Sequence, residues 1–417
     1  MTIAWPTKKL GELSDICRGS SPRPICDTKY FEGGTIPWVK IADATKSGKF
    51  LHETKEHVNE YGASFSRRLP PGTILVAASG TLGYTQILGV EGCAHDGWLI
   101  LQNLKNLDRD FAYYALKTLE QHFFNSGSGA AIQNINTDIL RQTEIPYPPM
   151  LVQRRIAGIL SAYDELIENS QRRIRILETM ARALYREWFV HFRFPGHETH
   201  PRVPSPLGDI PQGWEVKTLG DMAETFRGRS YRSIDLADEV GIPFLNLKCI
   251  DRDGGFRRSG IKRYIGKYKD SHVARKGDIV VAVTDMTQER RLVAHAARVP
   301  SLGCDFGVCS MDLVRIEPKP PMPKAFLYCF LRFSSFADEV KQHANGANVL
   351  HLSPDRITDF RFAVPPQALM SRFADFTAAS LEQIDTLENQ MENLRRTRDL
   401  LLPRLLSGQV ELKTEAA

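Results

Sequence analysis

Two stretches of this sequence repeat one another: residues 5–19, WPTKKLGELSDICRG, and residues 214–228, WEVKTLGDMAETFRG. They align at a constant offset of 209 residues. The identical pairs include Leu10/Leu219, Gly11/Gly220, Arg18/Arg227 and Gly19/Gly228. Internal similarity at a fixed spacing indicates a duplicated structural unit, and it has to be recognised before single elements are assigned.

The similarity continues in the same order along both halves of the chain. Residues 36–38 (IPW) match 242–244 (IPF), and 72–77 (GTILVA) match 277–282 (GDIVVA). Residues 129–149 match 346–366 at an offset of 217, and both stretches end in a pair of prolines. Each half is therefore predicted to be one copy of the same fold.

Each copy is predicted to begin with a globule of mixed helix and strand. Short β-branched runs predict buried strands at 73–78, 97–102, 279–283 and 312–316, and helical spacing of apolar residues predicts helices at 109–124 and 323–343. Residues 194–213, which are rich in proline and glycine, predict a linker between the copies.

A long helix is predicted after the paired prolines of each copy, because apolar residues alternate there at spacings of four and three. The predicted apolar seam, the line of side chains along which two such helices pack, is Ile156, Leu160, Tyr163, Ile167, Ile174, Leu177, Leu184, Trp188, Phe373, Ile384, Leu387, Met391, Leu394, Leu401 and Leu405. Arg398 interrupts this seam, which predicts a local break or a polar contact with another subunit.

Chain order predicts how these helices pair. If the first runs from the first globule to the second, the second helix can pack on it only by running back, so the pair is antiparallel. The predicted fold class is α+β, with two mixed domains separated by a pair of long antiparallel coiled-coil helices and a pseudo-two-fold relation from the duplication. The predicted boundaries are 1–150 for the first domain, 151–193 for the first helix, 194–213 for the linker, 214–366 for the second domain, 367–407 for the second helix and 408–417 for a tail.

Composition excludes several classes of protein. Charged residues make up 25% of the 417 and apolar residues 42%, which fits a folded globular protein and not a disordered chain. No apolar run reaches the roughly 18 residues that a bilayer needs. The seven cysteines and the absence of a signal peptide predict free thiols in a cytoplasmic protein without a membrane partner.

Two divergent globules on a rigid spacer would suit a ligand with two features at a fixed distance, and DNA is the leading candidate. Residues 225–300 contain sixteen basic and nine acidic residues, an excess of seven basic residues. Residues 1–110 have an excess of only one basic residue. In the first globule Arg23, Lys40, Lys46, Lys49, Arg67 and Arg68 could share one basic face. The predicted DNA-binding residues of the second globule include Arg227, Arg229, Arg232, Lys248, Arg257, Arg258, Lys262 and Arg263.

The clearest local difference between the copies follows the matched strands. The first copy has SGTLGY at 79–84 and the second TDMTQERR at 284–291. Gln288, Arg290 and Arg291 could pair with base edges, and Thr81 and Tyr84 offer hydroxyl groups. An ordinary turn that needs Gly80 and Gly83 for backbone reasons is an equally good interpretation.

Signatures of catalysis are missing. The sequence has no phosphate-binding GxxxxGK[ST] loop, no complete dinucleotide fingerprint and no cysteine or histidine pairs at zinc spacing. We therefore predict no catalytic residue, no metal site and no cofactor bound by this chain.

The sequence resembles the specificity subunit of type I restriction-modification systems over essentially its whole length. The resemblance is carried by WPTKKLGEL from Trp5, by PLGDIPQGWEVKTLGD ending at Asp221, by the PP-x3-QRRIAGIL run ending at Leu160, by LYREWFVHFRFPGHE ending at Glu198 and by LLPRLLSGQVEL ending at Leu412. The second copy has ALMSR at 368–372 where the first has LVQRR at 151–155, so the match is weaker there.

The resemblance implies two target recognition domains, each binding one half of a split double-stranded DNA sequence, with the helices as spacer. It also implies two methyltransferase (modification) subunits and ATP-driven restriction (translocase/endonuclease) subunits as partners. S-adenosylmethionine, ATP and magnesium would then be bound by those partners. Docking surfaces are expected on the outward helix faces, whose arginines are Arg172, Arg173, Arg175, Arg182, Arg395 and Arg396; a solvated face is the alternative.

Three hypotheses remain open on the sequence. The first is a DNA specificity subunit without catalysis of its own. The second is a non-catalytic protein-interaction scaffold that does not bind DNA. The third is a nuclease or methyltransferase with an unrecognised site.

Overall fold

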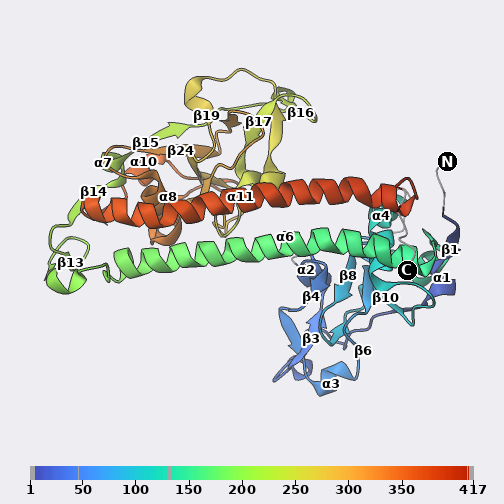
Figure 1. Ribbon diagram of the computed structural model, residues 1–417. Coiled ribbons are helices and arrows are strands. Elements are labelled where there is room, and N and C mark those ends of the chain that lie inside the picture. The colour runs from blue at the N-terminus through green and yellow to red at the C-terminus, as the bar shows by residue number, and fades with distance from the viewer. Residues whose placement is uncertain (1–4, 46, 129–133, 411, 413–417) are drawn as a thin grey trace. The chain divides into compact units, whose positions relative to one another are not determined.

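The computed structural model describes residues 5–45, 47–128, 134–410 and 412 (Figure 1). The chain forms two compact units. Unit 1 is discontinuous in sequence, and the boundaries between the units fall within the two long helices. Unit 1 holds Met1–Ser170 and Gln390–Ala417, and unit 2 holds Gln171–Asn389. Each compact unit thus combines one globule with a part of each long helix.

Unit 1 is built on two sheets. Its proximal sheet, which faces the helices, has strand order β2-β10-β7-β8-β4, with bounds Asp15–Arg18, Trp98–Gln102, Ile74–Ala77, Thr85–Leu88 and Phe50–Leu51. Its distal sheet has order β5-β3-β9-β6, with bounds Glu56–Val58, Ile36–Val39, Gly92–Ala94 and Arg67–Leu69. Strands β1 (Thr7–Lys9) and β11 (Glu144–Pro146) pair antiparallel and bring the two ends of the globule together.

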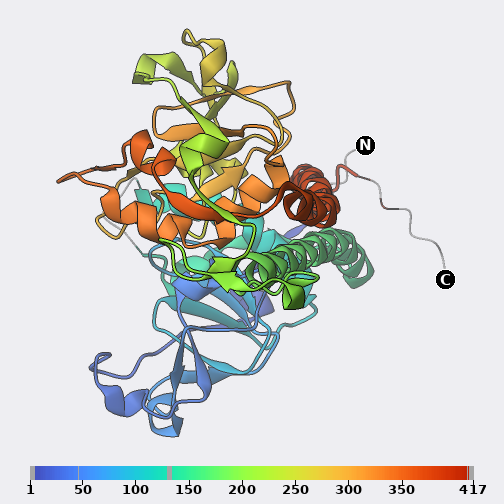
Figure 2. The ribbon, with the colours of Figure 1, turned by 90° about the vertical axis from the view of Figure 1, so that its left-hand side faces the viewer.

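Unit 2 repeats this plan. Its proximal sheet has order β15-β24-β20-β22, with bounds Ala223–Arg227, Leu313–Pro318, Ile279–Ala282 and Ala296–Arg298. Its distal sheet has order β16-β18-β17-β23-β19, with bounds Leu236–Ala237, Lys262–Tyr264, Ile242–Leu245, Gly307–Cys309 and Val273–Ala274. Strands β14 (Glu215–Thr218) and β26 (Arg361–Val364) pair as β1 and β11 do, and β21 (Thr284–Asp285) pairs with β25 (Leu350–His351). Figure 2 shows the distal strands of each unit on the side away from its helices.

The helices complete both units. Unit 1 has α1 (Leu10–Leu13), α2 (Ile41–Ala44), α3 (Glu60–Ala63), α4 (Arg109–Ser128) and α5 (Thr137–Gln142). Unit 2 has α7 (Leu219–Met222), α8 (Lys324–Phe333), α9 (Phe336–Val340) and α10 (Pro354–Thr358). The helix predicted at 323–343 is thus split between α8 and α9, and the first helix predicted, at 109–124, lies within α4. None of the helices in the described part of the chain is long and apolar enough to cross a membrane.

Two long helices follow the two globules, as the seam predicted. Helix α6 covers Met150–Tyr185 and continues as a π-helical turn at Arg186–Val190, and α11 covers Gln367–Leu406. All fifteen predicted seam residues are buried or half-buried. The apolar stripes of the two helices are therefore covered by other parts of the protein, whereas the stripe of an isolated amphipathic helix would be exposed to water.

Within unit 2 the halves of the two helices run antiparallel. Trp188 lies in the π-helical turn that continues α6, and Phe373 and Phe376 lie near the start of α11. The ring centre of Trp188 is 5.9 Å from that of each phenylalanine. Tyr185 lies 6.0 Å from Phe373, and Leu381 and Ile384 belong to the same buried core. Later residues of one helix thus meet earlier residues of the other. The pseudo-two-fold relation between the whole copies stays a prediction.

The predicted linker 194–213 is packed against unit 2. Phe194 and Ile210 are buried, and the ring of Phe194 lies 5.8 Å from that of Trp214. Strand β12 (Arg202–Val203) pairs with β13 (Ile210–Pro211). Its proline and glycine content predicted a linker, and its few apolar side chains fasten the segment to the globule.

Within unit 1, Arg398 explains the interruption of the seam. Its guanidinium forms an ion pair with Asp164 on α6 and a second with Asp399 at 2.8 Å. Asp164 also accepts a hydrogen bond of 2.5 Å from the hydroxyl of Tyr114 on α4. The expected break or contact with another subunit is corrected: the polar contact lies inside this chain, and it ties α11, α6 and the globule together.

We expect Arg398→Ala to destabilise unit 1 by about 3 kcal/mol, because it would leave the largely buried Asp164 without its cation. Urea unfolding followed by circular dichroism would measure this loss. Arg396→Ala, an exposed position on the same helix, should change stability by less than about 0.5 kcal/mol. Equal effects of the two substitutions would contradict the structural role of Arg398.

Unit 2 is fastened to α11 by a second polar cluster. Arg298 donates a hydrogen bond of 2.6 Å to Asp385, and Arg258 donates one of 2.7 Å to the side-chain oxygen of Asn389. Glu388 lies 3.9 Å from Arg258. Burial raises the pKa of Glu388 to about 7, although Arg258 opposes the shift.

The raised pKa of Glu388 predicts a pH-dependent contribution to stability. The unfolded chain releases this proton near pH 4.5 and the folded chain near 7, so stability falls as pH rises between them, by up to about 3 kcal/mol. Glu388→Gln replaces the carboxyl with an amide, which does not titrate in this pH range. We expect the variant to gain thermal stability over the parent as pH rises from about 5 to about 8. A difference in melting temperature that does not change with pH would contradict this.

Candidate nucleic-acid interface

A basic side chain contributes to phosphate binding only when its charge is not already balanced by a carboxylate. In unit 1 the structure balances several of the predicted DNA-binding residues. Lys40 lies 2.5 Å from Glu56 and over the ring of Trp38, and Arg68 contacts both Glu60 at 3.1 Å and Glu91 at 2.6 Å. These two residues therefore add little to a positive potential.

Lys49 does not lie on a basic face. It is buried, and its ammonium contacts the hydroxyl of Ser161 on α6 at 2.7 Å and Asp110 at 3.1 Å. Its inclusion among the surface cations is corrected, because its charge joins the globule to the helix. Lys46 lies outside the described residues.

Arg67 and Arg23 remain candidates in unit 1. Arg67 is exposed, and its Nε donates to the backbone oxygen of Arg18 at 3.1 Å. Arg23 is also exposed, although its guanidinium forms an ion pair with Asp96.

The loop at 79–84 fits the turn interpretation better than the base-contact one. Gly80 and Gly83 both have positive φ angles, of 70° and 76°, and a Cβ on Gly83 would lie 2.8 Å from the ring of Phe123. The hydroxyl of Tyr84 donates to the backbone oxygen of Ala44 at 3.1 Å, and burial raises its pKa. Thr81 is exposed and keeps its hydroxyl at the surface.

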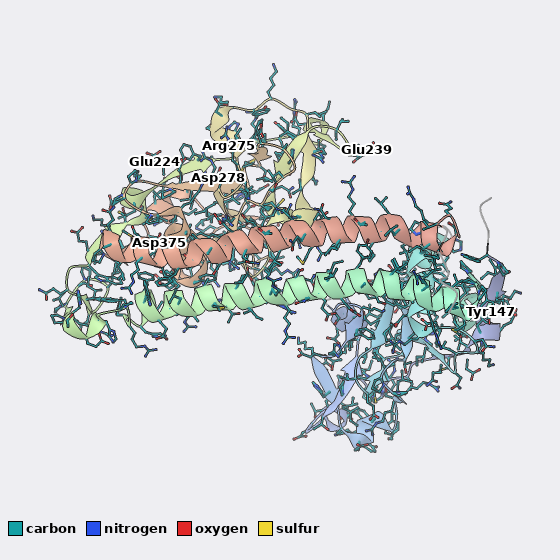
Figure 3. All side chains as sticks on the ribbon, viewed as in Figure 1. Tyr147, Glu224, Glu239, Arg275, Asp278 and Asp375 are labelled. Atoms are coloured by element: carbon teal, nitrogen blue, oxygen red, sulfur yellow. The ribbon has the colours of Figure 1, made fainter. Side chains whose placement is uncertain are left out.

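Unit 2 carries more unbalanced charge. Among the described residues, no carboxylate lies within ion-pair distance of seven of the predicted residues, namely Arg227, Arg229, Arg232, Lys248, Arg257, Lys262 and Arg263. Six of the seven are exposed and Arg229 is half-buried. Lys262 and Arg263 lie on the distal strand β18, and Arg257 donates through Nε to the backbone oxygen of Lys248 at 2.8 Å. Figure 3 shows the side chains of this unit, with Glu239 in the segment between β16 and β17.

Arg258 is different from these seven. It is half-buried and bonds to the backbone oxygen of Ser301 at 2.6 Å as well as to Asn389 on α11. Its guanidinium holds the globule on the helix, so its DNA-binding role stays a prediction with less support than that of the seven. Sequence could not separate it from its neighbour Arg257, since both are arginines in a basic run.

The loop that follows β20 in unit 2 is braced internally. Asp285 is buried; burial would raise its pKa, but hydrogen bonds from the N–H groups of Leu292 and Thr287 bring it below the ordinary value. Arg290 donates to the side chain of Gln342 at 3.0 Å, and Gln288 donates to the backbone oxygen of Ala347 at 2.9 Å.

Gln288 and Arg290 therefore anchor the loop to segment 342–347. Arg291 is exposed, and among the described residues its ion pair is with the exposed Glu289. Because an exposed ion pair is worth little, Arg291 can exchange it for a base or a phosphate.

Sequence reasoning missed Arg18 as a candidate. Its side chain is exposed, and its Nε donates to the backbone oxygen of Asp96 at 2.7 Å. The signal was present in the sequence, because Arg18 is identical to Arg227 in the repeat.

The proposed docking arginines lie on the long helices. Arg172, Arg173, Arg175, Arg182 and Arg396 are exposed, and Arg395 is half-buried. The guanidinium of Arg182 lies 5.5 Å from the ring centre of Phe333, so part of its surface is covered by its own unit.

The family model described as type I restriction modification DNA specificity domain matches this chain twice, at residues 3–179 and 211–393. The chain belongs to the type I DNA specificity family. Both matches begin at the repeated motif and extend along a long helix, so the family unit includes a globule and the spacer that follows it. The chain is a DNA specificity subunit, and nothing in the family favours the scaffold without DNA binding.

Relatives and solved structures agree with this assignment. The MjaIX specificity subunit of Methanocaldococcus jannaschii is 26% identical over 422 residues, which cover 98% of this chain and 94% of that protein. The MjaVIII specificity subunit of the same organism is 22% identical, covering 98% and 93%. The S subunit of the type I system of M. genitalium has a similar fold, with a TM-score of 0.61, 17% identity, and 98% and 97% of the two chains covered.

We expect Arg258→Ala and Arg263→Ala to separate folding from DNA binding in this specificity subunit. Arg258→Ala removes the bonds to Ser301 and Asn389, so the melting temperature should fall by about 5 °C. Arg263→Ala should leave melting unchanged, weaken duplex binding several-fold and lower the salt slope by about one. Unchanged melting of Arg258→Ala would contradict the anchoring role.

Proposed function

We propose that each domain of this subunit binds one half of a gapped, non-palindromic DNA sequence. The observation that carries this proposal is the combination of equal scaffolds with unequal surfaces. The two domains share the order of four matched strands in each sheet, including the parallel pairs β3–β9 and β17–β23, while β4 in unit 1 and β16 in unit 2 are extra edge strands. Their exposed basic residues differ in number and in acid partners. Two unlike binding surfaces on one plan suit two unlike half-sites.

The long helices support the spacer part of the proposal. Polar contacts fasten each globule to the helices, through Lys49 and Asp164 in unit 1 and, on α11, through Arg298 and Arg258 in unit 2. Such fastening limits how far a domain can pivot, and a fixed pivot is what makes the gap between half-sites definite.

In this proposal the chain supplies sequence recognition and no catalysis of its own. Its partners would be two methyltransferase subunits and, in the full complex, restriction subunits that use ATP. S-adenosylmethionine, ATP and magnesium would be bound by those partners. The exposed arginines of α6, Arg172, Arg173 and Arg175, would be part of the docking surface, since Arg is favoured at protein interfaces.

The test is to express the chain with its methyltransferase subunits in a host without other methylation and to sequence the methylome. We expect one bipartite motif with two different halves. Arg291→Ala should relax base preference in one half and leave the other half intact. Lys217→Ala, which removes a charge paired with Glu215, serves as the control and should leave the motif unchanged. A continuous motif, or loss of both halves in Arg291→Ala, would contradict the proposal.

A further inference from the structure

Most of the identical residues of the repeat have packing reasons, but the cation pairs Lys8/Lys217 and Arg18/Arg227 are not buried. Leu10 and Leu219 are fully buried. Gly19 and Gly228 are required because a Cβ there would lie 2.2 Å from the backbone oxygen of His95 and 1.9 Å from that of Ser310. Arg18 and Arg227 are both exposed. The core does not explain why the same arginine stands there in both domains.

The backbone around these arginines is the same in both domains. Arg18 is paired with Leu99, and Arg227 with Val314, at equivalent positions of the proximal sheets. The N–H of Gly19 donates to Trp98 at 2.8 Å, and that of Gly228 donates to Leu313 at 3.1 Å. The two side chains therefore leave the fold from the same place.

The identity extends four residues further into the surface turn. Residues 18–23 are RGSSPR and residues 227–232 are RGRSYR, so both domains contain Arg-Gly-x-Ser-x-Arg. Arg23 and Arg232 are exposed like the first arginine of each motif. We call these six-residue segments the arginine turns. The other identical cations, Lys8 and Lys217, lie over the ring of Tyr147 and 2.7 Å from Glu215, respectively. No such role within the described part of the fold explains the arginines of unit 2, so the retained arginines indicate a need that both domains share.

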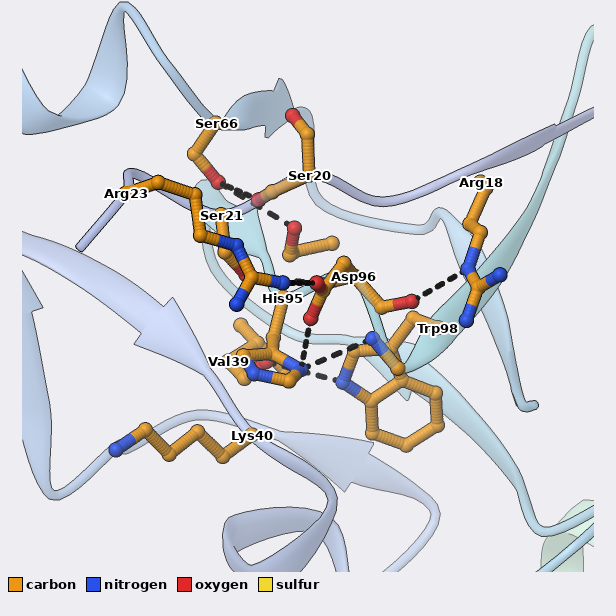
Figure 4. Close-up of polar contacts among 12 residues, drawn as sticks. Arg18, Ser20, Ser21, Arg23, Val39, Lys40, Ser66, His95, Asp96 and Trp98 are labelled. Carbon is orange, nitrogen blue, oxygen red and sulfur yellow. Dashed lines mark hydrogen bonds and ion pairs between the residues drawn. The ribbon is translucent and has the colours of Figure 1, made fainter. Parts of the chain in front are cut away.

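In unit 1 a single residue, Asp96, organises the arginine turn (Figure 4). Its backbone oxygen accepts from Nε of Arg18 at 2.7 Å, and its carboxylate forms an ion pair with Arg23. Its own N–H donates to the hydroxyl of Ser21 at 3.1 Å. Arg18 is thereby oriented with its terminal amines still available, while the charge of Arg23 is balanced.

In unit 2 the position of Asp96 is occupied by Met311. The equivalence follows from the turn itself, because Leu313 donates to Ser310 as Trp98 donates to His95, and Met311 follows Ser310 as Asp96 follows His95. Met311 is half exposed and cannot balance a charge. The arginine turn of unit 2 also has a third arginine, Arg229, so it carries more unbalanced charge than that of unit 1.

We propose that the arginine turns bind the DNA phosphate backbone in the same way in both half-sites. This rests on the proposed function. Half-sites of different sequence share only their sugar-phosphate backbone, and arginine offers several N–H donors in a planar fork that fits phosphate. Identical arginines contacting bases would instead select identical bases in both halves. Asp96 weakens the contribution of the first domain, so the second domain supplies more of the affinity that does not depend on sequence.

The test measures binding of the full chain to mixed-sequence duplexes over a series of salt concentrations. We expect Arg227→Ala with Arg232→Ala to lower affinity about 10-fold to 100-fold for every duplex and to reduce the salt slope by about two. The double variant Arg18→Ala with Arg23→Ala should reduce the salt slope by about one. Asp96→Asn keeps the backbone oxygen that holds Arg18 but removes the opposing charge, so it should strengthen binding several-fold for all sequences.

Controls separate charge from folding. Lys105→Ala with Lys217→Ala removes two cations that are already paired, with Asp15 and Glu215, and should bind as the parent does. Arg227→Lys with Arg232→Lys keeps the charge and should keep most of the salt slope. Melting temperatures of all variants should match that of the parent.

Two results would overturn the inference while the proposed function stands. One is that the Arg227→Ala, Arg232→Ala variant binds duplexes with the affinity of the parent. The other is that its affinity falls for one base sequence only. Weaker binding by Asp96→Asn would also count against it. If the unaltered chain shows no salt-dependent duplex binding, the proposed function itself fails.

Discussion

The two long helices need their apolar stripes covered, and the rest of the structure depends on how that is done. A helix of 36 or 40 residues with a continuous apolar face is not stable alone in water. In unit 2 the end of α6 and the start of α11 cover one another through Trp188 and Phe373, and α8 adds Phe326 to the same core. In unit 1 the other halves pack with Ile156 and Leu402 beneath the proximal sheet. In each unit the same buried core therefore holds helix segments and globule together.

Buried charges then decide how firmly each globule is held. Lys49, Asp164 and Arg398 in unit 1 and Arg258, Arg298 and Asp385 in unit 2 lie between a globule and the helices. Charges of this kind cost desolvation energy and give little net stability, but they penalise any arrangement that separates the partners. They thus favour one orientation of globule on helix, which suits a protein that must hold two surfaces at a set spacing.

In the proposed function the remaining charges at the surface carry the interaction with DNA, and acid partners decide which of them can do so. Arg68 and Lys40 are balanced by glutamates, whereas Lys262 and Arg263 have no carboxylate partner in the described structure. Net charge hides this distinction, since a lysine counts the same whether or not it is paired. The first domain, with its small excess of basic residues, can still present Arg18 and Arg67 because their hydrogen bonds go to backbone oxygens and not to carboxylates.

The sequence by itself determined the duplication, the mixed globules, the strands that became β7 and β20, and the seam of α6 and α11. These follow from periodicity and repeated order, which are local properties of a chain. Only the tertiary structure decided that Lys49, Arg258 and Arg398 serve the interior, that the compact units divide both helices, and that Asp96 balances Arg23 where Met311 leaves Arg232 unopposed. Pairing of charges across dozens or hundreds of residues depends on which surfaces meet, and no local pattern encodes that.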